Sequence, residues 1–181
     1  MDILRQLKSF LVKTLKLLDS LLIKFEVFVL SWAIIIISIM TFGNVLNRQI
    51  TGSSWLFAAE VSQIAIIMAT FMGISYAARK GRHISMSAFF DMAPKKVKKA
   101  LSIINPFITA IVLFVLSYYA YDYTLSQTRT TTALEIPYWV MVMFMPIGLF
   151  LGGIQFLRNM WVNIVNKEVY LAQERKDYDE Q

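Results

Sequence analysis

The chain has 181 residues, of which 57% are hydrophobic, and its mean hydropathy is +0.55. These values exclude a soluble domain of ordinary composition and leave room for one membrane domain. The net charge of +6 does not indicate nucleic-acid binding, because the basic residues flank apolar segments, where they fix topology and contact anionic lipids. Cysteine is absent, which excludes disulfides and thiolate metal sites, and the single histidine, His83, cannot form a paired-histidine haem site.

The N-terminal segment predicts an amphipathic helix. Residues 3–22 place leucines at spacings of three and four, with lysines and an arginine on the other faces. We assign residues 1–24 to a helix lying in the cytoplasmic membrane interface. A cytoplasmic extension of the first transmembrane helix is the alternative. A signal peptide is disfavoured, because lysines interrupt the apolar segment and no small-residue cleavage site follows.

Four runs without charged residues follow, at residues 27–46, 61–78, 101–121 and 136–157. Each has close to the roughly 20 residues that a bilayer core of about 30 Å requires. The fold class predicted is therefore an all-α integral membrane protein, with a four-helix transmembrane domain over residues 25–165. Residues 166–181 are predicted to form a solvated cytoplasmic tail.

The basic residues divide unequally between the two sides of these runs. Five Lys and Arg precede the first run, seven lie between the second and third, and four follow the fourth, whereas the other two loops hold one each. Because short basic loops stay in the cytoplasm, we expect both termini inside the cell. The external loops, roughly 47–54 and 122–135, are too short to fold as domains, so any external ligand-binding domain must be a separate chain.

Aromatic and basic residues near the ends of the runs are candidate membrane-interface anchors, because such side chains prefer the interface or the headgroups. They are Arg48, Trp55, Arg79, Arg82, His83 and Trp139.

Small residues recur at helical spacing in the second and fourth runs. In lipid such residues let helix backbones approach closely. Two roles stay open for these faces: packing inside the bundle, or docking onto a second membrane protein. The candidates are Ala65, Ala69, Gly73, Gly148 and Gly152.

Glu60 stands out as the only carboxylate that we place next to the apolar interior of a run. In a small proton-coupled exporter such a residue would be the coupling site. It lies only five residues from Trp55, however, and we favour an interface or polar-contact role. Prolines 106, 137 and 146 are expected to kink or start their helices. Nucleophile–base pairs, paired carboxylates and phosphate-binding glycine loops do not occur in the pattern, so we do not expect an enzyme.

The motifs collected so far resemble the small, four-span membrane subunit of tripartite ATP-independent periplasmic (TRAP) transporters. The resemblance covers most of the chain, from about residue 25 to 156. It departs from the family pattern at residues 57–60, where the family often has a tryptophan before the glutamate, and at Ser87, where an aspartate often follows the His-Ile pair. It rests on residues 44–48, Glu60, residues 71–84, residues 131–139 and residues 146–148.

The resemblance implies a sodium-coupled importer of organic acids in the bacterial inner membrane. A large membrane subunit would carry substrate and sodium ions, a periplasmic binding protein would deliver the substrate, and this chain would act as a scaffold without a cofactor of its own. The whole sequence looks closest to the sialic-acid branch, with four-carbon dicarboxylates left open. The alternative function is a self-contained proton-coupled exporter that works as a homodimer through Glu60.

Overall fold

The computed structural model describes residues 2–80 and 94–165, and the regular structure of this part is helical. Arg82, His83 and the expected tail 166–181 lie outside the described residues. Four segments are long and apolar enough to cross a membrane, which confirms the four predicted spans: Ser20–Thr51, Leu56–Arg79, Lys96–Ser126 and Tyr138–Val165. The helices are α1 (Asp2–Thr51), α2 (Leu56–Lys80), α4 (Lys95–Ser126), α5 (Tyr138–Val142) and α6 (Phe144–Val165).

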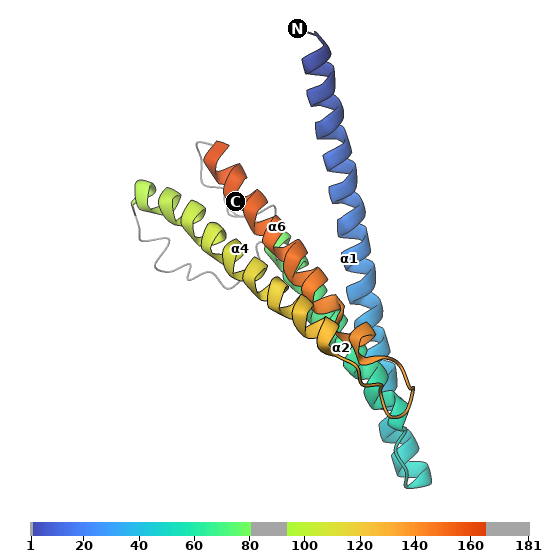
Figure 1. Cartoon of the computed structure of the whole chain (residues 1–181). Helices are drawn as coiled ribbons and strands as arrows, with labels where there is room; N and C mark the ends of the chain where they lie inside the picture. The colour runs from blue at the N-terminus through green and yellow to red at the C-terminus, as the bar shows by residue number, and fades with distance from the viewer. Residues whose placement is uncertain (1, 81–93, 166–181) are drawn as a thin grey trace, which may run out of the picture.

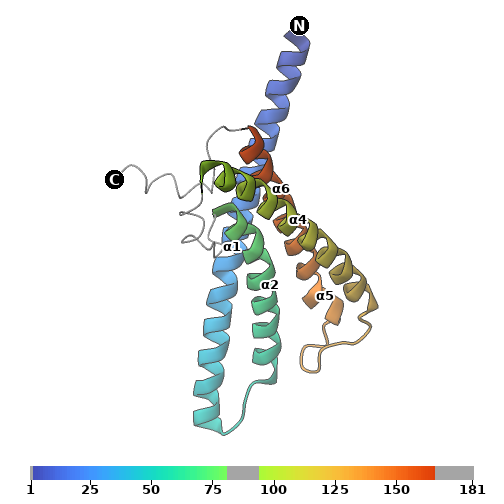
Figure 2. The same cartoon turned by 90° about the vertical axis from the view of Figure 1, so that its left-hand side faces the viewer.

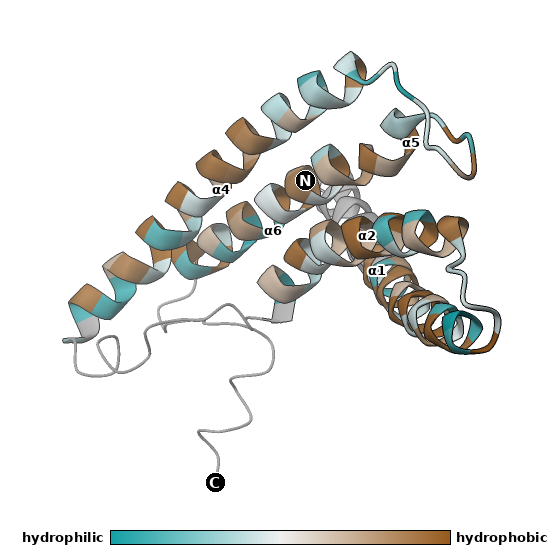
Figure 3. Ribbon diagram, turned by 90° about the horizontal axis from the view of Figure 1, so that it is seen from below, coloured by the Kyte–Doolittle hydropathy of each residue, from teal (hydrophilic) through white to brown (hydrophobic). Residues whose placement is uncertain are grey.

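The four spans form an open row, whereas the sequence suggested a bundle. α1 packs on α2, α2 on α6, and α6 on α4, so the spatial order is α1–α2–α6–α4. Figure 3 shows this order in a view from below. The row has two ends, which we call the loop end, where residues 52–55 and 127–137 connect the helices, and the basic end, where α4 begins (Figures 1 and 2).

α1 continues without a break through residue 24. Its 50 residues span about 75 Å at 1.5 Å per residue, more than twice a bilayer core. The N-terminal part projects past the other helices along the line of the span (Figure 2). The helix expected over residues 3–22 is therefore present, in the arrangement of the alternative interpretation. An interfacial position would need a bend near residue 24, and it stays a prediction.

The fourth span is divided into α5 and α6, with Met143 between them. Pro137 caps α5, and Pro146 lies in the first turn of α6. A proline there cannot donate a hydrogen bond to the carbonyl four residues earlier, in this case Val142, but it fits a first helical turn. Pro137 thus starts the fourth span, as expected, and Pro146 lies beside the interruption at Met143. Pro106 lies inside α4, which continues through it.

Small side chains set the spacing between α4, α6 and α2. The face of α4 toward α6 presents buried residues three and four positions apart: Ala110, Leu113, Ser117, Ala120 and Thr124. Across from them, a Cβ on Gly153 would come within 2.9 Å of the Phe114 ring. A Cβ on Gly148 would overlap the backbone carbonyl of Phe71 on α2. The backbones of α6 and α2 therefore approach closely at Gly148, and Gly153 leaves room for the Phe114 ring of α4.

Candidate functional site

The best-defined polar site of the loop end is a connection between α2 and the loop that precedes α5. The Glu60 carboxylate on the first turns of α2 accepts hydrogen bonds from the backbone N–H groups of Ala133 (2.8 Å) and Leu134 (2.9 Å). It also accepts one from the Thr132 hydroxyl (3.0 Å). Hydrogen bonds to an ionised acceptor are the stronger kind, so Glu60 holds residues 132–134 against α2. We call this contact the Glu60 clamp.

The clamped loop is itself a compact turn. Residues 130 and 137 form an isolated bridge, and the Thr131 N–H donates to the Ile136 carbonyl (2.9 Å). Glu135 sits in the left-handed region with φ 54°, which is unusual for a residue with a side chain. At the base of the turn the Arg129 guanidinium lies 3.9 Å from the centroid of the Tyr138 ring, within cation–π range. The loop end therefore has a fixed shape that Glu60 joins to the membrane helices.

At the basic end of α2 lies a buried ion pair that sequence reasoning missed. Glu26 of α1 is 0% exposed, and the Arg79 guanidinium of α2, 4% exposed, lies 3.7 Å from its Oε1 atom. The Ser75 hydroxyl donates to the same oxygen at 2.6 Å. The expectation that Glu60 alone stands beside an apolar interior was thus wrong. In the sequence, Glu26 directly precedes the first charge-free run, and Arg79 directly follows the second. Because consecutive spans run antiparallel, this placement could have predicted that the two residues lie at the same depth.

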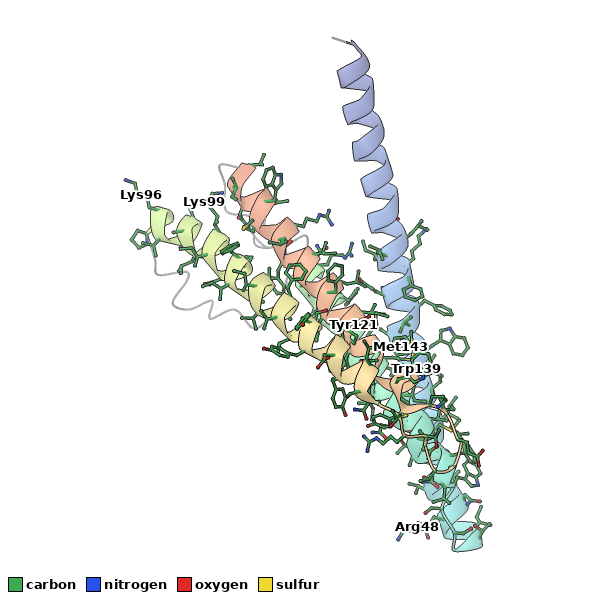
Figure 4. All side chains as sticks on the ribbon, viewed as in Figure 1. Arg48, Lys96, Lys99, Tyr121, Trp139 and Met143 are labelled. Atoms are coloured by element: carbon green, nitrogen blue, oxygen red, sulfur yellow. The ribbon has the colours of Figure 1, made fainter. Side chains whose placement is uncertain are left out.

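Arg79 was expected among the interface anchors, but its guanidinium points into the helix contact. The other described anchors lie on the surface: Arg48 is exposed, Trp55 is 39% exposed and Trp139 is 48% exposed. Figure 4 shows Arg48 at the loop end and Lys96 and Lys99 at the opposite end. The backbone N–H of Trp55 donates a hydrogen bond to Asn44 Oδ1 at 2.7 Å, and this bond fixes the connection between α1 and α2.

The small residues proposed for packing lie mainly inside the row. Ala65 is 3% exposed, and a Cβ added to Gly148 or to Gly152 would press against Phe71 or Ile74 of α2, respectively. Ala69 and Gly73 are half-buried. Ala65, Gly148 and Gly152 therefore face the chain's own helices. Contact with a partner through Ala69 or Gly73 stays a prediction.

A hollow lies between α4 and α6, with a volume of about 540 Å³. Its lining is almost entirely apolar, and the Ser117 hydroxyl in its wall already donates to the Pro146 carbonyl at 2.9 Å. The lining residues are Phe114, Ser117, Tyr118, Tyr121, Pro146, Ile147, Phe150 and Leu151. Such a lining suits hydrocarbon better than a charged solute. Within residues 2–80 and 94–165, no three His, Asp or Glu gather as metal ligands would.

Four apolar spanning helices, joined by a clamped turn and a buried ion pair, define a multi-pass helical membrane protein. The sequence profile of a known family, described as tripartite ATP-independent periplasmic transporters, DctQ component, matches residues 37–166. The ectoine TRAP transporter small permease protein TeaB of Halomonas elongata is 38% identical over 158 residues, which cover 86% of this chain and 82% of TeaB. The chain belongs to the DctQ family, the small permease component of TRAP transporters.

This membership confirms the resemblance inferred from the motifs and places the chain in the inner membrane. The family is a class of membrane transport subunits, which is not a class of enzymes. The comparison gives no support to the sialic-acid branch, since the similar protein is named for ectoine.

Proposed function

We propose that this chain is the small scaffold subunit of a sodium-coupled, binding-protein-dependent importer of organic acids. Its partners are a large membrane subunit, which carries substrate and sodium, and a periplasmic binding protein. Those two chains select the substrate, so sialic acid, dicarboxylates and ectoine all remain candidate substrates of the assembled transporter. The chain itself performs no chemistry.

The observation that carries this proposal is that α2 is fixed at both of its ends. The Glu60 clamp ties one end to the loop before α5, and the pair of Glu26 and Arg79 ties the other end to α1. Gly148 allows α6 to pack tightly against the middle of α2. A transport subunit that moves through a bilayer needs a neighbour that does not move. A helix held at three points suits that stationary role.

Reconstitution tests the proposal. The large subunit and the binding protein are incorporated into proteoliposomes with and without this chain, and uptake of labelled substrate is followed under an imposed sodium gradient. We expect uptake only when all three proteins are present. Full uptake without this chain, or uptake by this chain alone, would refute the scaffold function.

We also propose that the loop end faces the periplasm, with both termini in the cytoplasm. The support is the distribution of Lys and Arg, most of which lie toward the basic end or the termini. Because the natural chain has no cysteine, single cysteines report their side unambiguously. Cysteine at Ser53 or Thr130 should react with an impermeant thiol reagent added to intact spheroplasts, and cysteine at Ser85 should react only after lysis. The reverse pattern contradicts the orientation.

A further inference from the structure

α2 has an exposed face that differs from the other exposed surfaces of the spans. Gln63, Ile66 and Thr70 follow one another at spacings of three and four, so they lie on one side of the helix, and all three are exposed. Ala59, one turn earlier, is exposed as well. We call these four residues the α2 outer face. The small residues of α2 that point inward, such as Ala58 and Ala65, belong to a different side of the helix.

The α2 outer face lies deep in the expected membrane. The span Leu56–Arg79 has its centre between residues 67 and 68. At 1.5 Å per residue, Gln63 lies about 7 Å and Thr70 about 4 Å from that centre along the helix. A bilayer core extends roughly 15 Å to each side of its midplane. Both polar side chains therefore fall within the hydrocarbon layer.

Neither polar side chain has a hydrogen-bond partner within the described part of the chain. Elsewhere in the spans, Ser38 donates to the Ile34 carbonyl and Thr109 to the Asn105 carbonyl of its own helix, each at 2.8 Å. The Thr70 hydroxyl makes no such bond within α2, and the Gln63 amide offers two donors and an acceptor. Lipid tails cannot satisfy these groups, and an amide left without partners in an apolar medium is costly. The α2 outer face therefore suits a protein surface that supplies hydrogen bonds.

The neighbouring side chains favour a helix as the partner. Ala59 and Thr70 are small and exposed, so a second helix can approach closely on this side of α2. Helices in lipid associate through close approach at small residues and through side-chain hydrogen bonds across the contact. α4 also exposes an amide, that of Asn105, but the side chains around it are large, because Ile104, Phe107 and Ile108 are 46–54% exposed. A second helix could not approach as closely there as at the α2 outer face.

We propose that the α2 outer face is the docking surface for a transmembrane helix of the large subunit, which carries polar side chains that hydrogen-bond Gln63 and Thr70. The identity of that partner rests on the proposed scaffold function. In the open row α2 is an inner helix, so docking at this face would place the partner against the middle of the row.

Site-directed photo-crosslinking tests which chain covers this face. A photoreactive benzoylphenylalanine replaces Ile66 on the α2 outer face, and in a matched variant it replaces Leu116 on α4, which is exposed to a similar degree (51% and 47%). Both variants are co-expressed with the large subunit and the binding protein, illuminated in membranes and analysed by mass. We expect the product of this chain with the large subunit from position 66 and not from position 116. A product of two copies of this chain at position 66, or capture of the large subunit only from position 116, overturns the proposal.

Substitution tests the hydrogen bonds themselves. Gln63→Leu combined with Thr70→Val removes both polar groups, and Asn105→Leu removes a comparable amide from α4. Recovery of the large subunit with the tagged chain should fall about threefold for each hydrogen bond lost, the size found for such bonds between membrane helices. The Asn105→Leu variant should recover as much large subunit as the natural chain. Unchanged recovery with the double variant refutes the proposal, provided that gel filtration shows both variants monodisperse.

These outcomes separate the docking surface from the scaffold function. If the crosslink forms at position 66 but uptake does not require this chain, the surface is correct and the scaffold function is wrong. If uptake requires this chain but the crosslink forms elsewhere, the scaffold function stands and the surface is wrong.

Discussion

The two ends of α2 each carry a carboxylate contact, built in opposite ways. At the loop end, the half-exposed Glu60 accepts hydrogen bonds from Thr132, Ala133 and Leu134, and its negative charge keeps access to water. At the basic end, Glu26 is fully buried and its charge faces Arg79 and the Ser75 hydroxyl. A carboxylate that accepts hydrogen bonds from backbone N–H groups positions a loop, whereas removal of one partner from a buried ion pair leaves a buried charge. We therefore expect substitutions at the basic end to lower the stability of the whole fold, and substitutions at the loop end to change only the order of the loop.

The largest effect is expected from Arg79→Ala, which removes the guanidinium that lies 3.7 Å from the buried Glu26 carboxylate. Removing one member of a buried ion pair costs about 3–5 kcal/mol. Unfolding of the purified chain by increasing mole fractions of sodium dodecyl sulfate, followed by tryptophan fluorescence, measures this loss. The double variant Glu26→Leu with Arg79→Leu is the control, because an apolar pair of similar volume is often neutral or stabilising. Equal losses in the single and double variants would show that the charge pairing is not the reason.

The contact midway between the ends provides a reference. In Gly148→Ala, the new methyl group would overlap the Phe71 carbonyl, and overpacking of this kind costs about 1–3 kcal/mol. In Gly73→Ala, the methyl group would make only an ordinary contact with Leu30. The same unfolding experiment should therefore show a loss for Gly148→Ala and no loss for Gly73→Ala. If the two variants unfold alike, the close approach of α2 and α6 is not what fixes their spacing.

Glu60→Ala should loosen the loop before α5 without unfolding the helices. The N–H groups of Ala133 and Leu134 lose their acceptor, so their hydrogen exchange should become faster, while exchange around Ser75 should not change. Mass-spectrometric hydrogen exchange in detergent measures both regions in one sample. Glu60→Gln, which keeps an acceptor oxygen, should show a smaller change.

The same Glu60→Gln variant decides between the clamp and a coupling site. In reconstituted transporter we expect its uptake to keep the sodium dependence of the natural chain, because a positioning carboxylate binds no transported ion. Uptake that loses its sodium dependence while substrate binding persists would assign Glu60 to ion coupling.

The smallest effect is expected at Glu135, in the clamped loop. Its left-handed backbone conformation is unfavourable for a residue with a Cβ, and Gly accepts it without strain. Glu135→Gly should therefore change stability by less than about 1 kcal/mol, since relief of strain is offset by greater freedom of the unfolded chain. Leu134→Gly, at a neighbouring position without a positive φ, is the control. It relieves no backbone strain, so it should not raise the free energy of unfolding. A clear loss of stability in Glu135→Gly would show that the Glu135 side chain contributes a contact.

The sequence was sufficient to predict the four spans, because apolar, charge-free runs of this length are typical of transmembrane helices. It also indicated the exceptional position of Glu60, but the partners of Glu60 could not be predicted, since they are backbone groups more than 70 residues away. The inward direction of Ala65 and Gly148 could not be predicted either. In an all-apolar helix, hydropathy does not distinguish the side facing lipid from the side facing protein, and only the helix order α1–α2–α6–α4 decides it.

Glu26 shows a different kind of error. The residue is visible at the edge of a charge-free run, but a run defined to begin one position later leaves it out. Antiparallel neighbours bring the start of one span to the depth of the end of the next, so Glu26 and Arg79 could have been paired from topology alone. Gln63 and Thr70 were equally visible, but their exposure became known only from the structure.

The helix order also constrains how the protein is made. Along the chain α4 follows α2, yet in space α6 lies between them, and α6 is the last of the described helices to leave the ribosome. α1 and α2 can pair as soon as both are inserted, whereas α4 finds its main neighbour only after synthesis of the spans is complete. Until then α2 and α4 cannot pack against each other in the bilayer, because α6 must insert between them. A premature stop before residue 144 would therefore leave an α1–α2 hairpin and a solitary α4, two units whose buried faces would be open to membrane quality control.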